Sequence, residues 1–415
     1  MVFVIRPVNY MKARRTMRNL YFRVYQGVFK VVSRFLPWRE PVLIEGEDSI
    51  RRLADQIKKV NISNVLIVTD AVISSLGLMT GLLEDLKNAS IRYTVYDKTV
   101  PNPTVDNIEE ALILYHANKC EGIIAFGGGS SMDCAKGVGA RVARPGMTVA
   151  RMKGVLKIRK RIPTLFAVPT TAGTGSEATL AAVISNRETH EKYPINDTSL
   201  IPHYAVLDPL LTVGLPPHIT STTGMDALTH AVEAYIGRSN TAFTHKLSRD
   251  AVKLIFENIY TAYSNGTDSN ARKNMQKASY YAGVSFTRAY VGYVHAVAHT
   301  LGGFYGTPHG LANAVILPYV LDYFGESVHK PLSELSDLVG LGNPGASMEE
   351  KSNRFISAVK ELNAKMNIPL KIKGIKEEDI PLMVDRAYKE SNPLYPVPRI
   401  FTKTDFYNIY QMIKE

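Results

Sequence analysis

Short apolar runs alternate with longer amphipathic segments between residue 42 and about residue 215. The runs are NVLIVTD, RYTVYD, EGIIAFGGG, TLFAVPT and YAVLD. The segments between them, including VDNIEEALILYHANK and SSMDCAKGVGARVA, have apolar positions at helical spacing. Alternation of this kind is typical of a parallel sheet whose two faces are covered by helices. The pattern therefore predicts an α/β domain.

The pattern changes after about residue 220. Long segments of helical spacing replace the short runs, among them TAFTHKLSRDAVKLIFENIYTAYSN and NARKNMQKASYYAGVSFTRAY. Paired prolines in GLPPHIT form a natural boundary just before them. We therefore expect an N-terminal arm over residues 1–40, an α/β domain over residues 41–217 and an all-α domain over residues 218–415, and a chain of this length accommodates such a division.

The first 39 residues contain nine lysines and arginines and no acid. Apolar side chains recur there at helical spacing opposite basic ones, which predicts a basic amphipathic helix. The apolar set is Met17, Leu20, Tyr21, Val24, Tyr25, Val28, Val32 and Phe35, and the basic set is Arg18, Arg23, Lys30 and Arg34. Three interpretations are open: docking on the protein's own body, which we favour, docking on a membrane surface or a partner, and an organelle presequence.

Charge and composition narrow the class of protein. The net charge is +11, but outside residues 1–39 the chain carries only +2, so we expect no nucleic-acid partner. No uninterrupted apolar run is long enough for a membrane span, and two cysteines in 415 residues do not make a disulfide framework. We expect a cytoplasmic protein, with the organelle presequence as the alternative.

Two loops in the α/β domain suit a polar ligand. In IIAFGGGSSMDCAKGVGA a strand pattern leads through three glycines into a helix, so bare backbone and free N–H groups can face a phosphate. The stretch VPTTAGTGSEAT is rich in hydroxyls and small residues directly after another strand. Taken alone, each stretch is also compatible with an ordinary turn or loop.

The helical half contains a group of candidate metal ligands. Asp226 and His230 are four residues apart, as are His295 and His299, so each pair shares one face of a helix. His309 follows in the glycine-flanked TPHG. Each pair taken alone is also compatible with a simple hydrogen bond. Together, imidazoles and a carboxylate without thiolates favour a catalytic site for Fe²⁺, Zn²⁺, Co²⁺ or Mn²⁺ over Ca²⁺ or Mg²⁺.

Four motifs, in this order, resemble those of the iron-containing (group III, metal-dependent) alcohol dehydrogenases, which include lactaldehyde reductase, 1,3-propanediol dehydrogenase and butanol dehydrogenases. The motifs are GGGSSMDCAK, PTTAGTGSE, GMDALTHAVEAY and VHAVAHTLGGFYGTPHGLANAVILP. The resemblance extends from about residue 40 to the C-terminus and leaves out the arm. It implies an N-terminal dinucleotide-binding α/β domain and a helical C-terminal domain, related to the dehydroquinate synthase fold, with the metal in the cleft between them.

The resemblance also assigns roles to residues. It implies Asp226, His230, His295 and His309 as metal ligands and places His299 beside the substrate and the nicotinamide. For the cofactor, Gly127, Gly128, Gly129, Ser130 and Asp133 match the pyrophosphate loop, and Asn102 matches a residue near the ribose. Thr171, Thr174, Lys192 and Leu211 fall where the family lines the rest of the dinucleotide site.

Asp70, at the end of NVLIVTD, bears on the choice of nicotinamide. A carboxylate there can accept hydrogen bonds from the adenosine ribose and would repel a 2′-phosphate, which favours NAD over NADP. In the resembling family an acid at this place accompanies NAD use. The alternative is that Asp70 caps the helix-like AVISSLGLM.

These observations predict an oxidoreductase that transfers a hydride between a small primary alcohol or diol and its aldehyde, with NAD and a divalent metal as cofactors. The resemblance alone implies Fe²⁺ as that metal, with Zn²⁺ as the alternative. His299, one helical turn beyond His295, is well placed to pass the proton on, unless it is only a packing residue. The family leads us to expect a homodimer. The alternatives are a non-catalytic docking protein on this scaffold and a glycerol dehydrogenase-like relative, which the serine after the glycines disfavours.

Overall fold

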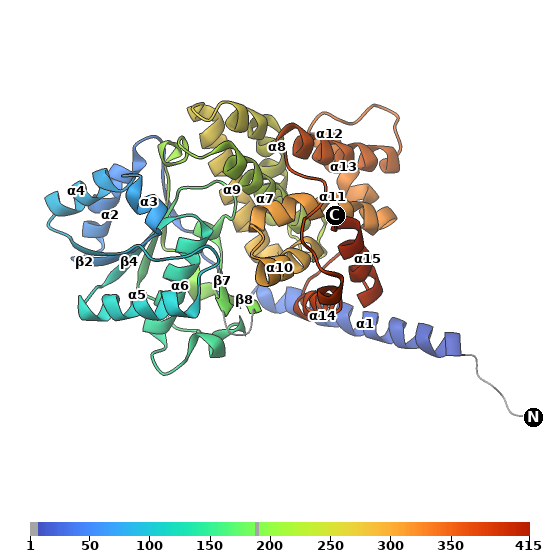
Figure 1. Cartoon of the computed structure of the whole chain (residues 1–415), viewed down its shortest axis with the longest axis horizontal. Coiled ribbons are helices and arrows are strands. Elements are labelled where there is room, and N and C mark those ends of the chain that lie inside the picture. The colour runs from blue at the N-terminus through green and yellow to red at the C-terminus, as the bar shows by residue number, and fades with distance from the viewer. Residues whose placement is uncertain (1–6, 187–190) are drawn as a thin grey trace, which may run out of the picture.

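The computed structural model describes residues 7–186 and 191–415, with side chains over 16–186 and 192–415. An α/β half and a helical half lie side by side, and the helix α1 (Pro7–Ser33) lies along the lower edge of the helical half, with one end beside β8 (Glu191–Asn196) (Figure 1). No helix in the described part of the chain is long and apolar enough to cross a membrane. The predicted fold class, an α/β domain followed by an all-α domain, is confirmed.

The α/β half is built on a six-stranded sheet in which every neighbouring pair is parallel. Its strands, in the order β1-β9-β6-β4-β2-β3, are Val42–Glu45, Tyr204–Leu207, Thr164–Pro169, Gly122–Gly127, Asn64–Val68 and Arg92–Tyr96. All residues of the two strands β2 and β4 are buried, as expected where helices cover both faces.

Each face of the sheet has its own hydrophobic core. One core includes side chains of α5 (Val105–Ala117) and α6 (Gly129–Ala143), and the other includes side chains of α2 (Leu53–Lys59) and α4 (Thr80–Asn88). The short helix α3 (Ala71–Ser75) begins directly after β2. Because the strands are parallel, the loops that enter α3 and α6 meet at the same edge of the sheet.

A second, small sheet was not predicted from the sequence. It consists of β5 (Gly154–Val155), β7 (Ala181–Asn186) and β8 (Glu191–Asn196), with β7 and β8 antiparallel. It lies between the main sheet and the helical half (Figure 1). Short 3₁₀ helices complete the connections, at Ser49–Arg52, Val149–Met152, Ser176–Ala178, Thr198–Leu200, Pro209–Thr212, Gly325–Val328 and Glu377–Asp379.

The helical half packs around one large core. Its helices are α7 (Pro217–Ile236), α8 (Ala242–Ser264), α9 (Ser269–Ala289), α10 (Tyr293–Tyr305), α11 (His309–Phe324), α12 (His329–Leu338), α13 (Met348–Lys365), α14 (Ile380–Ser391) and α15 (Lys403–Ile413). Helix α7 is buried at every position from Gly224 to Ile236, so it is the central helix of this half. Side chains of Thr241 and Asp268 cap α8 and α9, which fixes where these long helices begin.

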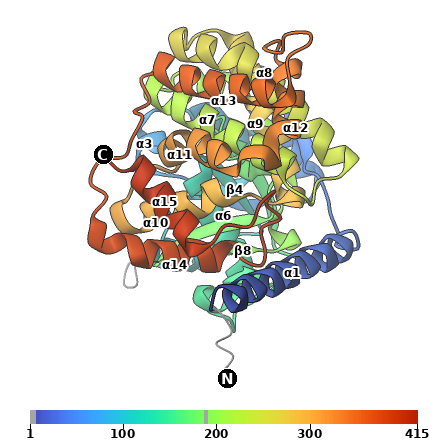
Figure 2. The ribbon, with the colours of Figure 1, turned by 90° about the vertical axis from the view of Figure 1, so that its right-hand side faces the viewer.

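Helix α1 docks on the helical half, which confirms the docking interpretation of the arm. Figure 2 shows it lying across the body beside the segment that follows α14. Arg23 donates hydrogen bonds to the carbonyls of Val397 and Pro398 at 2.7 and 2.8 Å, and Phe22 is buried in the core of this half. The docking face is not the apolar row, most of which is exposed to solvent. Residues 1–6 of the arm lie outside the described residues.

Candidate active site

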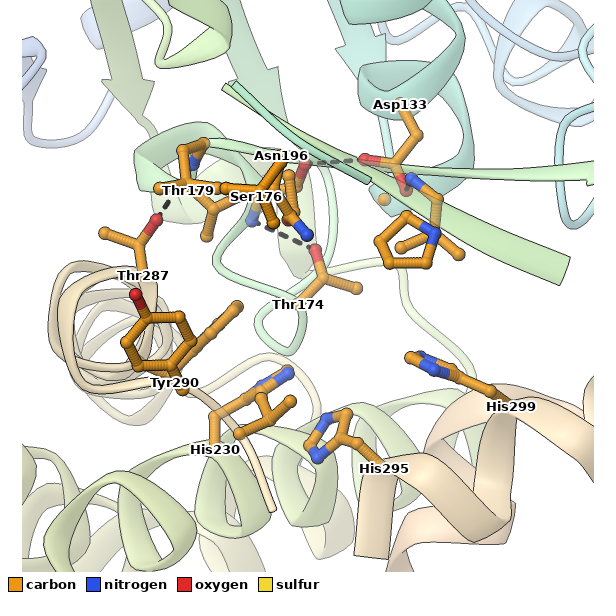
Figure 3. Close-up of a pocket in the computed structure, with 18 of the residues that line it drawn as sticks. Asp133, Thr174, Ser176, Thr179, Asn196, His230, Thr287, Tyr290, His295 and His299 are labelled. Carbon is orange, nitrogen blue, oxygen red and sulfur yellow. Dashed lines mark hydrogen bonds between the residues drawn. The ribbon is translucent and has the colours of Figure 1, made fainter. Parts of the chain in front are cut away.

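A cavity of about 250 Å³ lies where the two halves meet. From the α/β half it is lined by the start of α6, by the loop after β6 and by the small sheet. From the helical half it is lined by α7, by the end of α9, and by α10 and His309. In Figure 3 the imidazoles of His230, His295 and His299 point from the helical half toward the loop that holds Thr174 and Ser176.

The structure brings the four predicted metal ligands together. One ligand atom from each of Asp226, His230, His295 and His309 lies within 4.8 Å of the others. Asp226 and His230 are one turn apart on α7, His295 is on α10, and His309 is the first residue of α11. Gly310 allows α11 to begin this close to α7, because a Cβ there would lie 2.4 Å from the carbonyl oxygen of Thr222.

The electrostatics of this cluster suit a divalent cation. Burial, reinforced by neighbouring positive groups, holds the pKa of His230 and of His309 well below the usual value, so both imidazoles are neutral and have a free lone pair. Burial raises the pKa of Asp226, which is 1% exposed. Nδ1 of His230 and Nδ1 of His309 are buried without a hydrogen-bond partner among the described residues. Three imidazoles and one carboxylate therefore fit a borderline metal such as Fe²⁺ or Zn²⁺.

Residues that the sequence argument missed hold these ligands in place. Glu233 accepts hydrogen bonds from the backbone N–H groups of Gly292 and Val294, and one of its oxygens lies 2.6 Å from Nδ1 of His295. This orients Nε2 of His295 toward the cluster. Asn313 donates to Asp226 at 2.6 Å. Helical spacing could have found both residues, since Glu233 is seven residues after Asp226 and Asn313 is four after His309.

His299 lies at the cavity wall beside the cluster. Its ring centroid is 5.4 Å from that of His309. Its Nδ1 is 2.7 Å from Oε1 of Glu390 on α14, and the same oxygen accepts a hydrogen bond from the hydroxyl of Tyr395 at 2.8 Å. The partner of His299 is thus a carboxylate, not the backbone. No local pattern in the sequence points to Glu390, because it lies 91 residues from His299.

The glycine loop and the hydroxyl-rich loop face each other at the other side of the cavity. A Cβ on Gly129 would lie 2.7 Å from the side chain of Thr174, and one on Gly128 would lie 3.5 Å from that of Thr171. Gly127 has a φ of +144°. The two loops can therefore approach this closely only with a glycine at position 129, and the backbone at position 127 also favours glycine. Gly129 opens α6, so its N-terminal N–H groups face the space between the loops.

Asp70 lies at the rim of this loop as the N-cap of α3. Its Oδ1 accepts hydrogen bonds from the backbone N–H groups of Val72 and Ile73, both at 3.0 Å. Its Oδ2 is 3.5 Å from the hydroxyl of Ser131 and lies over Gly127. The capping alternative is thus realised with one carboxylate oxygen, while the other faces the glycine loop.

The remaining predicted cofactor residues divide into two groups. Asn102, Ser130, Asp133 and Lys192 line the cavity with Gly129 and Thr174. Lys192 on β8 donates to Oδ1 of Asn102 at 2.8 Å, and the carboxylate of Asp133 accepts from Ser176 and from the backbone of Val183, both at 3.0 Å. Leu211 does not line the cavity, since it packs in the core on one face of the sheet.

Comparison with known proteins agrees with this arrangement. The family model for iron-containing alcohol dehydrogenases matches residues 41–209, and the model for the C-terminal domain of the Fe-containing alcohol dehydrogenase family matches residues 220–413. The chain therefore belongs to the iron-containing alcohol dehydrogenase family. This confirms the resemblance drawn from the four motifs, and with it the class of enzyme.

Individual relatives are similar over most of the chain. Alcohol dehydrogenase 4 of Saccharomyces cerevisiae is 38% identical over 355 residues, which cover 85% of this chain and 91% of that one. The NAD-dependent methanol dehydrogenase of Bacillus methanolicus is 34% identical over 92% of this chain and 98% of that one. A crystal structure of 1,3-propanediol oxidoreductase superposes with a TM-score of 0.86 at 34% identity, covering 91% of this chain and 99% of that one.

Proposed function

We propose that this enzyme interconverts a small primary alcohol or diol and its aldehyde, with NAD and a divalent metal ion, preferably Fe²⁺. One observation carries the proposal: the three histidines of the four-donor cluster line the same cavity as Gly129 and Ser130 of the glycine loop, from the opposite side. A substrate held at the cluster would then lie next to a nicotinamide held by the loop. Hydride transfer requires this juxtaposition of substrate and cofactor.

Asp226, His230, His295 and His309 would hold the metal. When bound, such an ion supplies Lewis-acid polarisation of the alcohol or carbonyl oxygen. The protein supplies the geometry, because Glu233 and Asn313 fix the orientation of the ligands. The cluster supports Zn²⁺ as well, since affinity at such a site follows ligand type and metal availability.

The loop that opens α6 would hold the pyrophosphate of the dinucleotide through its free backbone N–H groups. The oxygen of Asp70 that faces the loop favours NAD, because a carboxylate near the ribose would repel a 2′-phosphate. The printed name of the Bacillus methanolicus relative, an NAD-dependent methanol dehydrogenase, agrees with this preference. Lys192, on the small sheet, would position Asn102 beside the bound cofactor.

His299 would move the proton. With Nδ1 directed at Glu390, its imidazole can exchange a proton with the reacting oxygen through Nε2. The hydroxyl of Tyr395 donates to the same carboxylate and so helps to fix its orientation. Phe286, Tyr290 and Leu394 add an apolar part to the wall, which suits a short carbon chain and excludes water.

The proposal is tested with enzyme purified anaerobically and loaded with Fe²⁺. A panel of short primary alcohols, diols and their aldehydes is assayed with NAD and NADP in both directions. We expect cofactor-dependent turnover on at least one alcohol and aldehyde pair, with NAD preferred. Metal-loaded enzyme without turnover on any member of the panel would contradict the proposal.

A further inference from the structure

The outer face of α1 is an exposed apolar row on the helix. It consists of Met17, Leu20, Val24, Val28 and Val31, and it continues just after the helix with Phe35; their exposed fractions range from 55 to 84%. Single exposed apolar residues are ordinary on a protein surface, but a contiguous row of this length marks an interaction site. The row spans most of the described side chains of α1.

The opposite face of α1 holds the helix on the body. Gln26 donates to the carbonyls of Pro393 and Tyr395 at 3.0 and 2.8 Å, and the ring of Phe29 lies 5.9 Å from that of Tyr290. Lys30 reaches the carbonyl of Arg238 at 2.8 Å. The helix is therefore formed and anchored without a partner on its outer face. Binding there would cost little conformational entropy, because the helix does not have to be ordered first.

A strongly basic surface adjoins the row at the end of α1. Residues 151–161, RMKGVLKIRKR, contain six lysines and arginines and no acid, and all six are exposed. Arg159, Lys160 and Arg161 line one pocket together with Leu36 and Arg39, which follow α1. Both views place α1 and this part of the α/β half along the same lower edge of the molecule (Figures 1 and 2).

We propose that the apolar row of α1 and the basic segment 151–161 together dock this enzyme on the surface of an anionic phospholipid membrane. The row would enter the boundary between headgroups and acyl chains, and the basic side chains would contact the lipid phosphates. This contact would be peripheral, because it is made by exposed side chains on the surface of the folded protein. The inference rests on surface residues alone and holds whichever alcohol the enzyme uses.

Charge decides between a membrane and a second copy of the chain. Residues 151–161 hold six exposed lysines and arginines and no acid, so self-association through this face would bring like charges together. An anionic lipid surface complements both the charge and the apolar row. The proposal adds a membrane contact on the outer face of α1 to the docking on the body that its inner face makes. One face of α1 thus contacts the body of the protein, and the opposite face would contact the membrane.

The test measures co-sedimentation of the full-length protein with two kinds of vesicle, phosphatidylcholine alone and phosphatidylcholine mixed with phosphatidylglycerol. We expect binding to the anionic vesicles only, weakening as salt is added. The triple variant Val24→Ser, Val28→Ser, Phe35→Ser should bind the anionic vesicles at least about tenfold more weakly than wild type, since affinity scales with the apolar area inserted. Leu370→Ser, an equally exposed apolar residue elsewhere, is the matched control and should bind like wild type.

A second set of variants tests the basic segment. Lys157→Gln, Arg159→Gln, Lys160→Gln should lose most binding, while Lys246→Gln, Lys253→Gln, Lys371→Gln, which change three exposed lysines of the helical half, should not. Unchanged thermal unfolding midpoints show that the variants fold. Equal or negligible binding of wild type to both kinds of vesicle overturns the proposal. It is also overturned if the triple row variant changes the oligomeric state measured by light scattering and leaves vesicle binding unaltered.

Discussion

The proposed ligand His295 has a carboxylate partner that fixes its ring, because Nδ1 lies 2.6 Å from Glu233 and only Nε2 is then directed at the cluster. His230 and His309 are kept neutral mainly by burial, which leaves their lone pairs free for a metal. The sequence could predict the four donors because their spacing and residue types are distinctive. It could not predict Glu390, since the contact of α14 with α10 is formed only by the tertiary fold.

His309→Ala removes one of the four donors. We expect metal occupancy and turnover to fall together, because a site with three remaining donors binds a divalent ion more weakly. The measurement is metal content by elemental analysis beside steady-state activity. His218→Ala, which changes an exposed histidine on the same half, should leave both unchanged. Full occupancy in His309→Ala would remove this residue from the ligand set.

Two substitutions separate the helix cap that Asp70 forms from its proposed selection of NAD. Asp70→Asn keeps a capping oxygen and removes the charge, so kcat/KM with NADP should rise about tenfold while stability changes little. Asp70→Ala removes the cap as well and should lower the free energy of unfolding by about 1 kcal/mol. Kinetics with both cofactors and denaturant unfolding measure the two effects. If NADP gains nothing in either variant, Asp70 is a helix cap alone.

At the scale of elements, the start of α6 in the glycine loop forms the wall of the cavity opposite the histidines. The sequence predicted the strand, the glycines and the helix that compose it, since their pattern is local. It did not predict β7 and β8, because this hairpin is short and half-buried and contains Pro194, which is unusual in a strand. That omission matters, since β8 provides Lys192 to the cavity.

Gly129→Ala tests the close approach of the glycine loop to the loop that holds Thr174. The added Cβ would lie 2.7 Å from Cγ2 of Thr174, so one loop must move and the dinucleotide site should distort. We expect KM for NAD to rise about tenfold or more, with a smaller effect on stability. Gly146→Ala, where nothing lies within 4 Å of the added Cβ, is the control and should bind NAD normally. An unchanged KM in Gly129→Ala would separate this loop from the cofactor.

At the scale of the whole molecule, α1 joins the site to the outer surface. Phe29 on α1, and Leu36 and Trp38 just after it, line the same cavity as the metal cluster. The amphipathic pattern predicted the helix, but it could not tell which face docks. The docking face consists of Phe22, Gln26 and Phe29, because backbone carbonyls of residues 393–398 and the ring of Tyr290 lie opposite this side of the helix. Only the tertiary fold brings those partners to the helix.

Phe22→Ala tests whether the arm belongs to the fold. Phe22 is 7% exposed within the core of the helical half, so its removal should cost about 3 kcal/mol of unfolding free energy. Loosening of α1 should also raise KM for the substrate, because the arm forms part of the cavity wall. Val28→Ala, on the exposed face of the same helix, should change stability by less than about 0.5 kcal/mol. Equal stabilities of the two variants would show that α1 contributes nothing to the fold.

The central claim is that the four-donor cluster holds the metal on which alcohol oxidation depends. The most direct test titrates metal-free enzyme with Fe²⁺ under anaerobic conditions and measures NAD-dependent activity at each addition. The metal-free protein should be folded and inactive, and activity should rise linearly and stop at one equivalent of bound metal per chain. Asp226→Asn should remain inactive at the same metal concentration. Full activity in the metal-free enzyme, or full activity in Asp226→Asn, would contradict the account.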